Sequence, residues 1–95
     1  MSDTDDKFYD RADEYIDLAN KQISEKSNAI DVSASFLYSA SRFNAWISAA
    51  GFKNGKEMAE VKDEMLEHFV KDYREMLDEN MTDYIENFNE YMQVK

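Results

Sequence analysis

The chain has 95 residues, no cysteine and a formal net charge of −10 at pH 7. Its length fits one domain with a modest core, and the lack of cysteine excludes disulfides, thiolate metal ligands and thiol catalysis. The negative charge opposes phosphate backbones and anionic lipid, so we expect no nucleic-acid partner and no membrane partner.

The first segment predicts an amphipathic helix over about residues 4–26, with a disordered N-terminus at 1–4. Phe8, Ala12, Tyr15 and Ala19 recur at helical spacing, and carboxylates fill the opposite face. The N-terminal residues lack the basic and apolar regions of a secretory signal. We therefore expect a cytoplasmic protein.

A second helix is predicted over residues 32–50. Between Val32 and Phe52 the only charged side chain is Arg42, so this helix must be shielded from water nearly all round. The segment has transmembrane length, but Arg42 and its serines are costly in hydrocarbon, which favours burial in a soluble fold. We expect Asp31 or Ser33 to cap this helix, and Gly51 to end it in a left-handed conformation.

Two faces of this second helix differ in side-chain size. At 100° per residue, the large apolar side chains gather on one side. The opposite side carries a small-residue ridge, formed by Ala34, Ser41, Ala45 and Ser48. Small residues let another helix backbone approach closely, so two contact surfaces are predicted.

The third helix is predicted over residues 55–92, opened by a capping box of Asn54 and Glu57. Its apolar residues follow one another at steps of three or four and form what we term the apolar stripe: Leu66, Val70, Tyr73, Leu77, Met81, Tyr84, Phe88 and Met92. A kink near Asn80 would turn the last residues into a fourth helix. The predicted fold is all-α, a three-helix antiparallel bundle with a long C-terminal helix in one domain of residues 1–95; a monomeric four-helix bundle is the alternative.

The length of the third helix has a consequence for assembly. A helix of about 37 residues spans roughly 55 Å, whereas the second helix spans only about 30 Å. The overhang would leave apolar side chains in water, namely Tyr84, Ile85, Phe88, Tyr91 and Met92, and exposed stripes of this kind mark interfaces. A homodimer is therefore predicted, with an interface formed by the small-residue ridge and by Met81, Tyr84, Phe88 and Met92.

Several segments resemble a known family. They are residues 8–13 (Phe-Tyr-Asp-Arg-Ala-Asp), 32–38 with Ala40, 42–45, and 83–88 (Asp-Tyr-Ile-Glu-Asn-Phe). Together they resemble a mostly proteobacterial family of short acidic proteins classed as a domain of unknown function, over nearly the whole chain. The resemblance implies a bacterial source and a self-contained small domain, and it brings no catalytic or binding residue.

Arg42 is the most distinctive candidate for a ligand site. Tyr38 lies one turn before it and Trp46 one turn after it, so the guanidinium can lie against both rings. With Asn44 and Ser35, these residues would form an anion or carboxylate pocket. The structural alternative, which we favour, is an Arg stacked on aromatic rings and paired with an acid from another helix or chain.

Other candidate chemistry is weaker. His68, the only histidine, lies between Glu64 and Asp72 at one-turn spacing, but a solvated face explains the row better than a metal site. We therefore predict no catalytic residue, no cofactor and no metal ligand. Between Glu75 and Glu90 there are six carboxylates and no basic group, which favours solubility or a docking face for a basic protein.

These observations predict a non-enzymatic, homodimeric protein–protein interaction module. The alternative is a small-anion or carboxylate binder, or a minor enzyme, with its pocket at Arg42.

Overall fold

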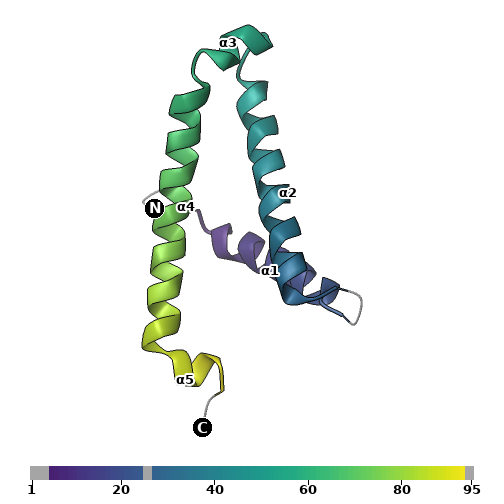
Figure 1. The fold of residues 1–95 in the computed structure, drawn as a ribbon, viewed down its shortest axis with the longest axis vertical. Helices are drawn as coiled ribbons and strands as arrows, with labels where there is room; N and C mark the ends of the chain where they lie inside the picture. Colours follow the sequence, from purple (N-terminus) through teal and green to yellow (C-terminus); the bar gives the residue numbers. More distant parts are fainter. Residues whose placement is uncertain (1–4, 25–26, 94–95) are drawn as a thin grey trace. The chain divides into compact units, whose positions relative to one another are not determined.

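A computed structural model describes residues 5–24 and 27–93 (Figure 1). Over those residues the chain forms helices and no strand: α1 (Phe8–Gln22), α2 (Ala29–Ala50), α3 (Gly55–Ala59), α4 (Lys62–Glu86) and α5 (Phe88–Tyr91). The predicted all-α class is confirmed. The chain divides into two compact units, one ending at Gly51 and the other beginning at Phe52, which are described separately. That the two form one domain stays a prediction.

Helix α1 is shorter than the helix predicted over residues 4–26. Before it, the Asp5 carboxylate accepts hydrogen bonds from the Lys7 backbone N–H, at 2.9 Å, and from the Arg11 guanidinium, at 3.2 and 2.8 Å. This local turn takes the place of a first helical turn. The helix ends at Gln22, because Ile23 is extended (φ −71°, ψ 119°). The predictions for residues 1–4 and 25–26 lie outside the described residues.

Helix α2 begins at Ala29, three residues earlier than predicted. The Asn28 side chain caps it by accepting a hydrogen bond from the Asp31 backbone N–H at 2.9 Å, so the prediction of Asp31 or Ser33 as the cap was wrong. The helix ends at Ala50 as predicted. Gly51, however, has φ −86° and ψ 0° and is not left-handed. Its N–H bonds to the Ser48 carbonyl at 3.2 Å, which closes the last turn without a glycine-specific conformation.

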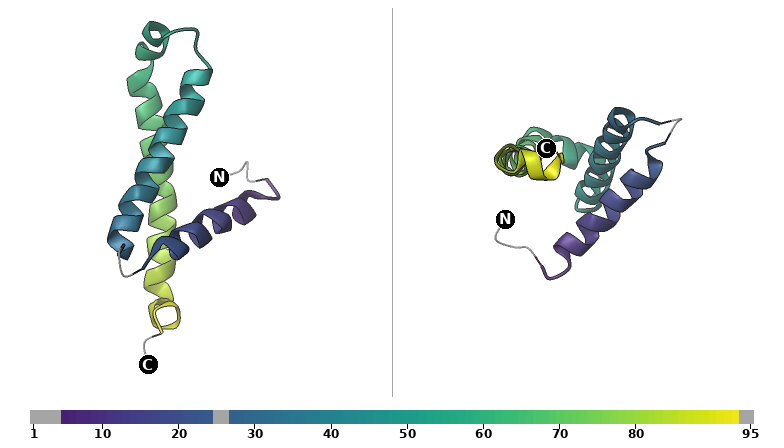
Figure 2. Two further views of the ribbon diagram at one scale, coloured as in Figure 1. Left: turned by 90° about the vertical axis from the view of Figure 1, so that its right-hand side faces the viewer. Right: turned by 90° about the horizontal axis from the view of Figure 1, so that it is seen from below.

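In the first unit, α1 packs across the beginning of α2 and then diverges from it (Figures 1 and 2). Val32, in the first turn of α2, is 6% exposed and is the one buried residue among those described. The rings of Tyr15 and Phe36 meet across the helix pair with centroids 6.4 Å apart. The expectation that α2 is shielded nearly all round is not met within this unit, because Leu37, Tyr38 and Trp46 are each more than half exposed.

The second unit divides the predicted 55–92 helix into α3, α4 and α5. The predicted cap is confirmed: the Asn54 side chain accepts from the Glu57 backbone N–H at 2.9 Å. The Glu57 carboxylate in turn accepts from the Lys53 N–H at 3.4 Å, one residue earlier than in a standard capping box. Helix α3 ends because Val61 leaves helical geometry (φ −116°, ψ 12°), and its N–H bonds to the Met58 carbonyl at 3.1 Å.

Helix α4 runs through Asn80 without a break, so the kink considered there was wrong. Asp78, Glu79 and Asn80 all tolerate helical geometry, and neither Gly nor Pro interrupts it. The break comes instead at Asn87, and continuity to residue 92 was also wrong. The chain then makes the short helix α5, which packs on the end of α4 (Figure 1). Within the part described, no helix combines the length and hydropathy needed to cross a membrane.

Candidate functional site

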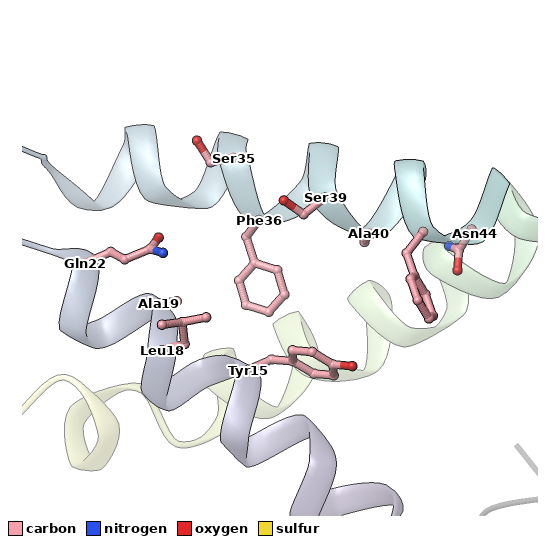
Figure 3. Close-up of a pocket in the computed structure, with 10 residues that line it drawn as sticks. Tyr15, Leu18, Ala19, Gln22, Ser35, Phe36, Ser39, Ala40 and Asn44 are labelled. Atoms are coloured by element: carbon pink, nitrogen blue, oxygen red, sulfur yellow. The ribbon is translucent and has the colours of Figure 1, made fainter. Parts of the chain in front are cut away.

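An apolar groove lies between α1 and α2. Its volume is about 730 Å³, and its walls come from both helices: Tyr15, Leu18, Ala19 and Gln22 from α1, and Ser35, Phe36, Ser39, Ala40, Phe43 and Asn44 from α2. Phe36 points from α2 toward Tyr15 and Leu18 (Figure 3). The groove exists because α1 contacts only the first part of α2 and then diverges. Most of its wall is carbon, so it suits an apolar occupant better than an anion.

The groove coincides only in part with the predicted Arg42 pocket. Asn44 and Ser35 line it, whereas Arg42, Tyr38 and Trp46 do not. Sequence reasoning missed the α1 wall as part of a site. Tyr15 and Ala19 were assigned only to the apolar face of the first helix, and the angle between the helices cannot be obtained from one helix alone.

Arg42 is exposed, and it makes no ion pair with any carboxylate in the described ranges 5–24 and 27–93. Trp46 instead stacks on Phe43, with ring centroids 5.8 Å apart and an interplanar angle of 30°. Tyr38 and Trp46 are 65% and 66% exposed. The three predicted pocket residues thus form an open row on α2, and a ligand pocket there stays a prediction.

The small-residue ridge lies on the side of α2 that faces away from the groove, because its residues are about half a turn from Phe36 and Phe43. Both of its hydroxyls bond back to the helix: Ser41 donates to the Tyr38 carbonyl at 2.7 Å, and Ser48 to the Asn44 carbonyl at 2.8 Å. The side chains of the ridge are short and uncharged, and their hydroxyls already have acceptors. The ridge is therefore a flat, nearly neutral surface.

The apolar stripe runs along α4 and into α5. Met81 is 56% exposed, and Tyr84, Phe88 and Met92 are also more than half exposed. Within the second unit, the short helix α5 packs on the C-terminal end of α4. The side chains of the stripe are therefore an apolar surface that their own unit leaves largely open.

The sequence matches a family model over residues 8–85, and the family is described as "Protein of unknown function (DUF3144)". The chain belongs to the DUF3144 family. An NMR structure of the protein NB7890A from Shewanella sp, a proteobacterium, is similar, with 41% sequence identity, 97% of each chain covered and a TM-score of 0.77. A comparison with curated proteins found no match. The resemblance predicted from the sequence is confirmed.

In this DUF3144 chain, a hydrogen-bonded cluster forms where α4 meets α5. The Asn87 side chain donates to the carbonyl of Asp83 at 3.0 Å and to its carboxylate at 2.9 Å, and the Tyr91 hydroxyl lies 3.2 Å from both carboxylate oxygens. Tyr84 and Tyr91 meet edge to face at 4.9 Å. Hydrogen bonding to the Asp83 carboxylate raises the pKa of Tyr91 above its ordinary value, because ionised Tyr91 would repel that carboxylate.

This cluster explains why the helix breaks at Asn87. The Asn87 amide bonds to the Asp83 carbonyl, which also accepts the Asn87 backbone N–H at 3.0 Å. The one-turn spacing of Asp83 and Asn87 is visible in the sequence, but many such pairs occur in unbroken helices. The cluster could not be predicted without the position of Tyr91.

Of the predicted series Glu64, His68 and Asp72, only the last two are in contact in this DUF3144 chain. His68 Nε2 lies 3.4 Å from Asp72 Oδ2, and the imidazole is largely exposed. Glu64 does not take part in this contact. Among the residues that the structure describes, no group of His, Asp and Glu side chains is arranged to hold a metal ion.

Proposed function

We propose that the chain is a homodimeric, non-enzymatic protein–protein interaction module. The observation that carries this proposal is the open apolar stripe of α4 and α5, in a chain whose described residues include only one that is buried. Exposed apolar surface of this extent is unfavourable in water, and association covers it.

The distribution of charge on α4 supports association with an identical chain. Viewed down the helix, the stripe from Leu66 to Tyr84 falls within an arc of about 80°. The carboxylates of Glu75, Asp78, Glu79, Asp83 and Glu86 fall outside that arc. Two copies of a chain with net charge −10 can therefore bring their stripes together while most of these carboxylates remain in water.

The small-residue ridge of α2 offers a second surface for the same assembly. Its side chains are short and its hydroxyls have acceptors, so a helix can approach closely without burying an unsatisfied polar group. A two-fold dimer uses each surface twice, which increases the area it buries.

Sedimentation velocity at a few to about a hundred micromolar tests the proposal. We expect a species of twice the 11.2 kDa chain mass at tens of micromolar. Ala45→Glu, on the ridge, should weaken it, whereas Ser33→Glu, which adds the same charge to α2 outside the ridge, should not. A monomer throughout that range would refute the proposal.

A small-anion or carboxylate site at Arg42 is the alternative function. Its support is the exposed guanidinium without an ion-pair partner in the part of the chain described. It is the weaker proposal because Arg42, Tyr38 and Trp46 do not share a cavity. A titration with phosphate and with acetate tests it, and binding lost in a folded Arg42→Ala variant would support it.

We further propose a cytoplasmic location and allow for a basic protein as a second partner. The location is supported by the lack of cysteine, since such a chain needs no oxidising compartment, and the partner by the six carboxylates between Glu75 and Glu90. Binding to such a partner should weaken as salt is raised. Association that does not depend on salt would contradict it.

A further inference from the structure

The side chains of Tyr38, Arg42 and Trp46 follow one line of α2 at spacings of four residues, and we call them the Arg42 row. The two aromatic side chains are about two-thirds exposed, and Arg42 is exposed as well. None of the three lines the groove against α1. Apart from the stack of Trp46 on Phe43 within α2, the row is therefore a strip that its own unit leaves open.

The composition of the row is that of a binding hot spot. Tyr, Trp and Arg are the residue types that contribute most to protein interfaces, because they combine a large apolar area with hydrogen-bond donors. Burying the Arg42 guanidinium requires a carboxylate. From Val32 to its end at Ala50, α2 has none, so a surface elsewhere, in this chain or in a second copy, must supply it.

Charge complementarity identifies that surface. The C-terminal half of α4 lies within the stretch from Glu75 to Glu90, which has six carboxylates and no basic group. It also exposes apolar side chains, with Met81 56% and Ile85 74% exposed. An acidic border beside open apolar side chains matches a guanidinium between two aromatic rings.

One carboxylate is placed best for this contact. Asp78, Met81 and Ile85 follow one line of α4 at spacings of three and four residues, so Asp78 borders the exposed apolar side chains. Its side chain makes no hydrogen bond or ion pair with any other described residue. Asp83 borders the stripe on its other side, but its carboxylate is occupied by Asn87 and Tyr91.

We propose that in the homodimer the Arg42 row of one copy docks on the C-terminal half of α4 in the second copy, where Arg42 pairs with Asp78. Two-fold symmetry makes this contact twice, once in each direction. The inference rests on the proposed homodimer and adds the residues that meet in it.

A double-mutant cycle on the dimer dissociation constant tests the contact. We expect Arg42→Ala and Asp78→Asn each to raise Kd about tenfold, and the double variant to be little worse than either one. Glu79→Gln, which removes the neighbouring carboxylate about 100° around the helix, is the matched control and should show no coupling to Arg42→Ala. The charge swap Arg42→Asp with Asp78→Arg should restore most of the affinity.

Trp46, the only tryptophan, gives a second readout because it lies in the row. Its emission should shift to longer wavelength when the dimer is diluted, and Asp78→Asn should move this transition to higher protein concentration, whereas Glu79→Gln should leave it in place. If Arg42→Ala does not fold, the comparison of Asp78→Asn with Glu79→Gln decides alone. Equal shifts of the fluorescence transition by these two variants would overturn the inference.

The other outcomes separate the inference from the proposed function. Additive effects of Arg42→Ala and Asp78→Asn on the Kd of an intact dimer would overturn the Arg42–Asp78 contact and leave the homodimer standing. Coupling in urea unfolding without coupling in Kd would place the pair within one chain, which also overturns it. A chain that stays monomeric would overturn both.

Discussion

Replacing Met81 by Ala tests whether the apolar stripe is an interface. Burying a Met side chain fully contributes about 1.5–3 kcal/mol. Met81 is still 56% exposed, so covering the remainder contributes about 1–1.5 kcal/mol in each copy. A two-fold dimer holds two such side chains, and the loss is then about 2–3 kcal/mol, or about 30- to 150-fold in Kd.

Sedimentation equilibrium at several loading concentrations measures this change. Thr82→Ala is the matched control, because Thr82 is the next residue on the same helix but lies outside the arc of the stripe. We expect its Kd to stay within about twofold of the original value, as for a surface substitution. A Met81→Ala dimer as tight as the unmodified one, or equal losses for both variants, would refute the argument from exposed apolar area.

Three further predictions concern stability and pH. Gly51→Ala should stabilise the chain by about 0.4–1 kcal/mol in urea unfolding, because alanine restricts the unfolded chain more than glycine does. The native backbone accepts alanine, since φ is −86° and the added Cβ would lie 3.5 Å from the Ser48 carbonyl oxygen, an ordinary contact. Destabilisation would restore the left-handed assignment made from the sequence. Asn54→Ala should cost about 1 kcal/mol by removing the cap of α3, and Asn89→Ala, without a capping role, should cost much less; equal losses would exclude a capping effect. The hydrogen bonds from Arg11 hold the pKa of Asp5 below its ordinary value of 3.8, so this pair stabilises the fold above that pH and the contribution is lost as pH falls through the lowered pKa. An NMR titration should show that Arg11→Ala raises the Asp5 pKa toward 3.8, and an unchanged value would contradict this assignment.

Periodicity and capping patterns predicted much of the helical structure, because both depend on residues close together in the sequence. The apolar stripe, the cap at Asn54 and the end of α2 at Ala50 are examples. The Asn28 cap could have been found from its spacing to Asp31, but Asp31 and Ser33 were equally good capping residues, and propensity alone does not rank them.

The helix breaks at Val61 and Asn87 were not predicted, because neither has a glycine or proline signal. At Asn87 a side-chain amide bonds to a helix carbonyl, and Tyr91 holds the following turn against Asp83. Asp83 and Tyr91 are eight residues apart and would lie about two turns from each other along a continuous helix, so their contact depends on the break. Sequence periodicity carries no information about this contact, since the apolar spacing continues through the break.

The groove between α1 and α2 could not be predicted from sequence for a different reason. Its walls were recognised as apolar faces, but its opening depends on where α1 departs from α2. The predicted Arg42 pocket coincides with this groove only in part, because Asn44 lines the groove and Arg42 does not. Neighbouring residues on a helix point in different directions, so proximity in the sequence alone does not show which side chains share a surface.

The central claim is that a second copy of the chain covers the apolar stripe. An isotope-filtered NOESY spectrum of a sample in which labelled and unlabelled chains are mixed in equal amounts tests it most directly, because it detects only contacts between copies. We predict intermolecular NOEs to the methyl groups of Met81 and Met92 and to the ring of Tyr84. A spectrum in which these groups show strong contacts within one chain and none between copies would contradict the account.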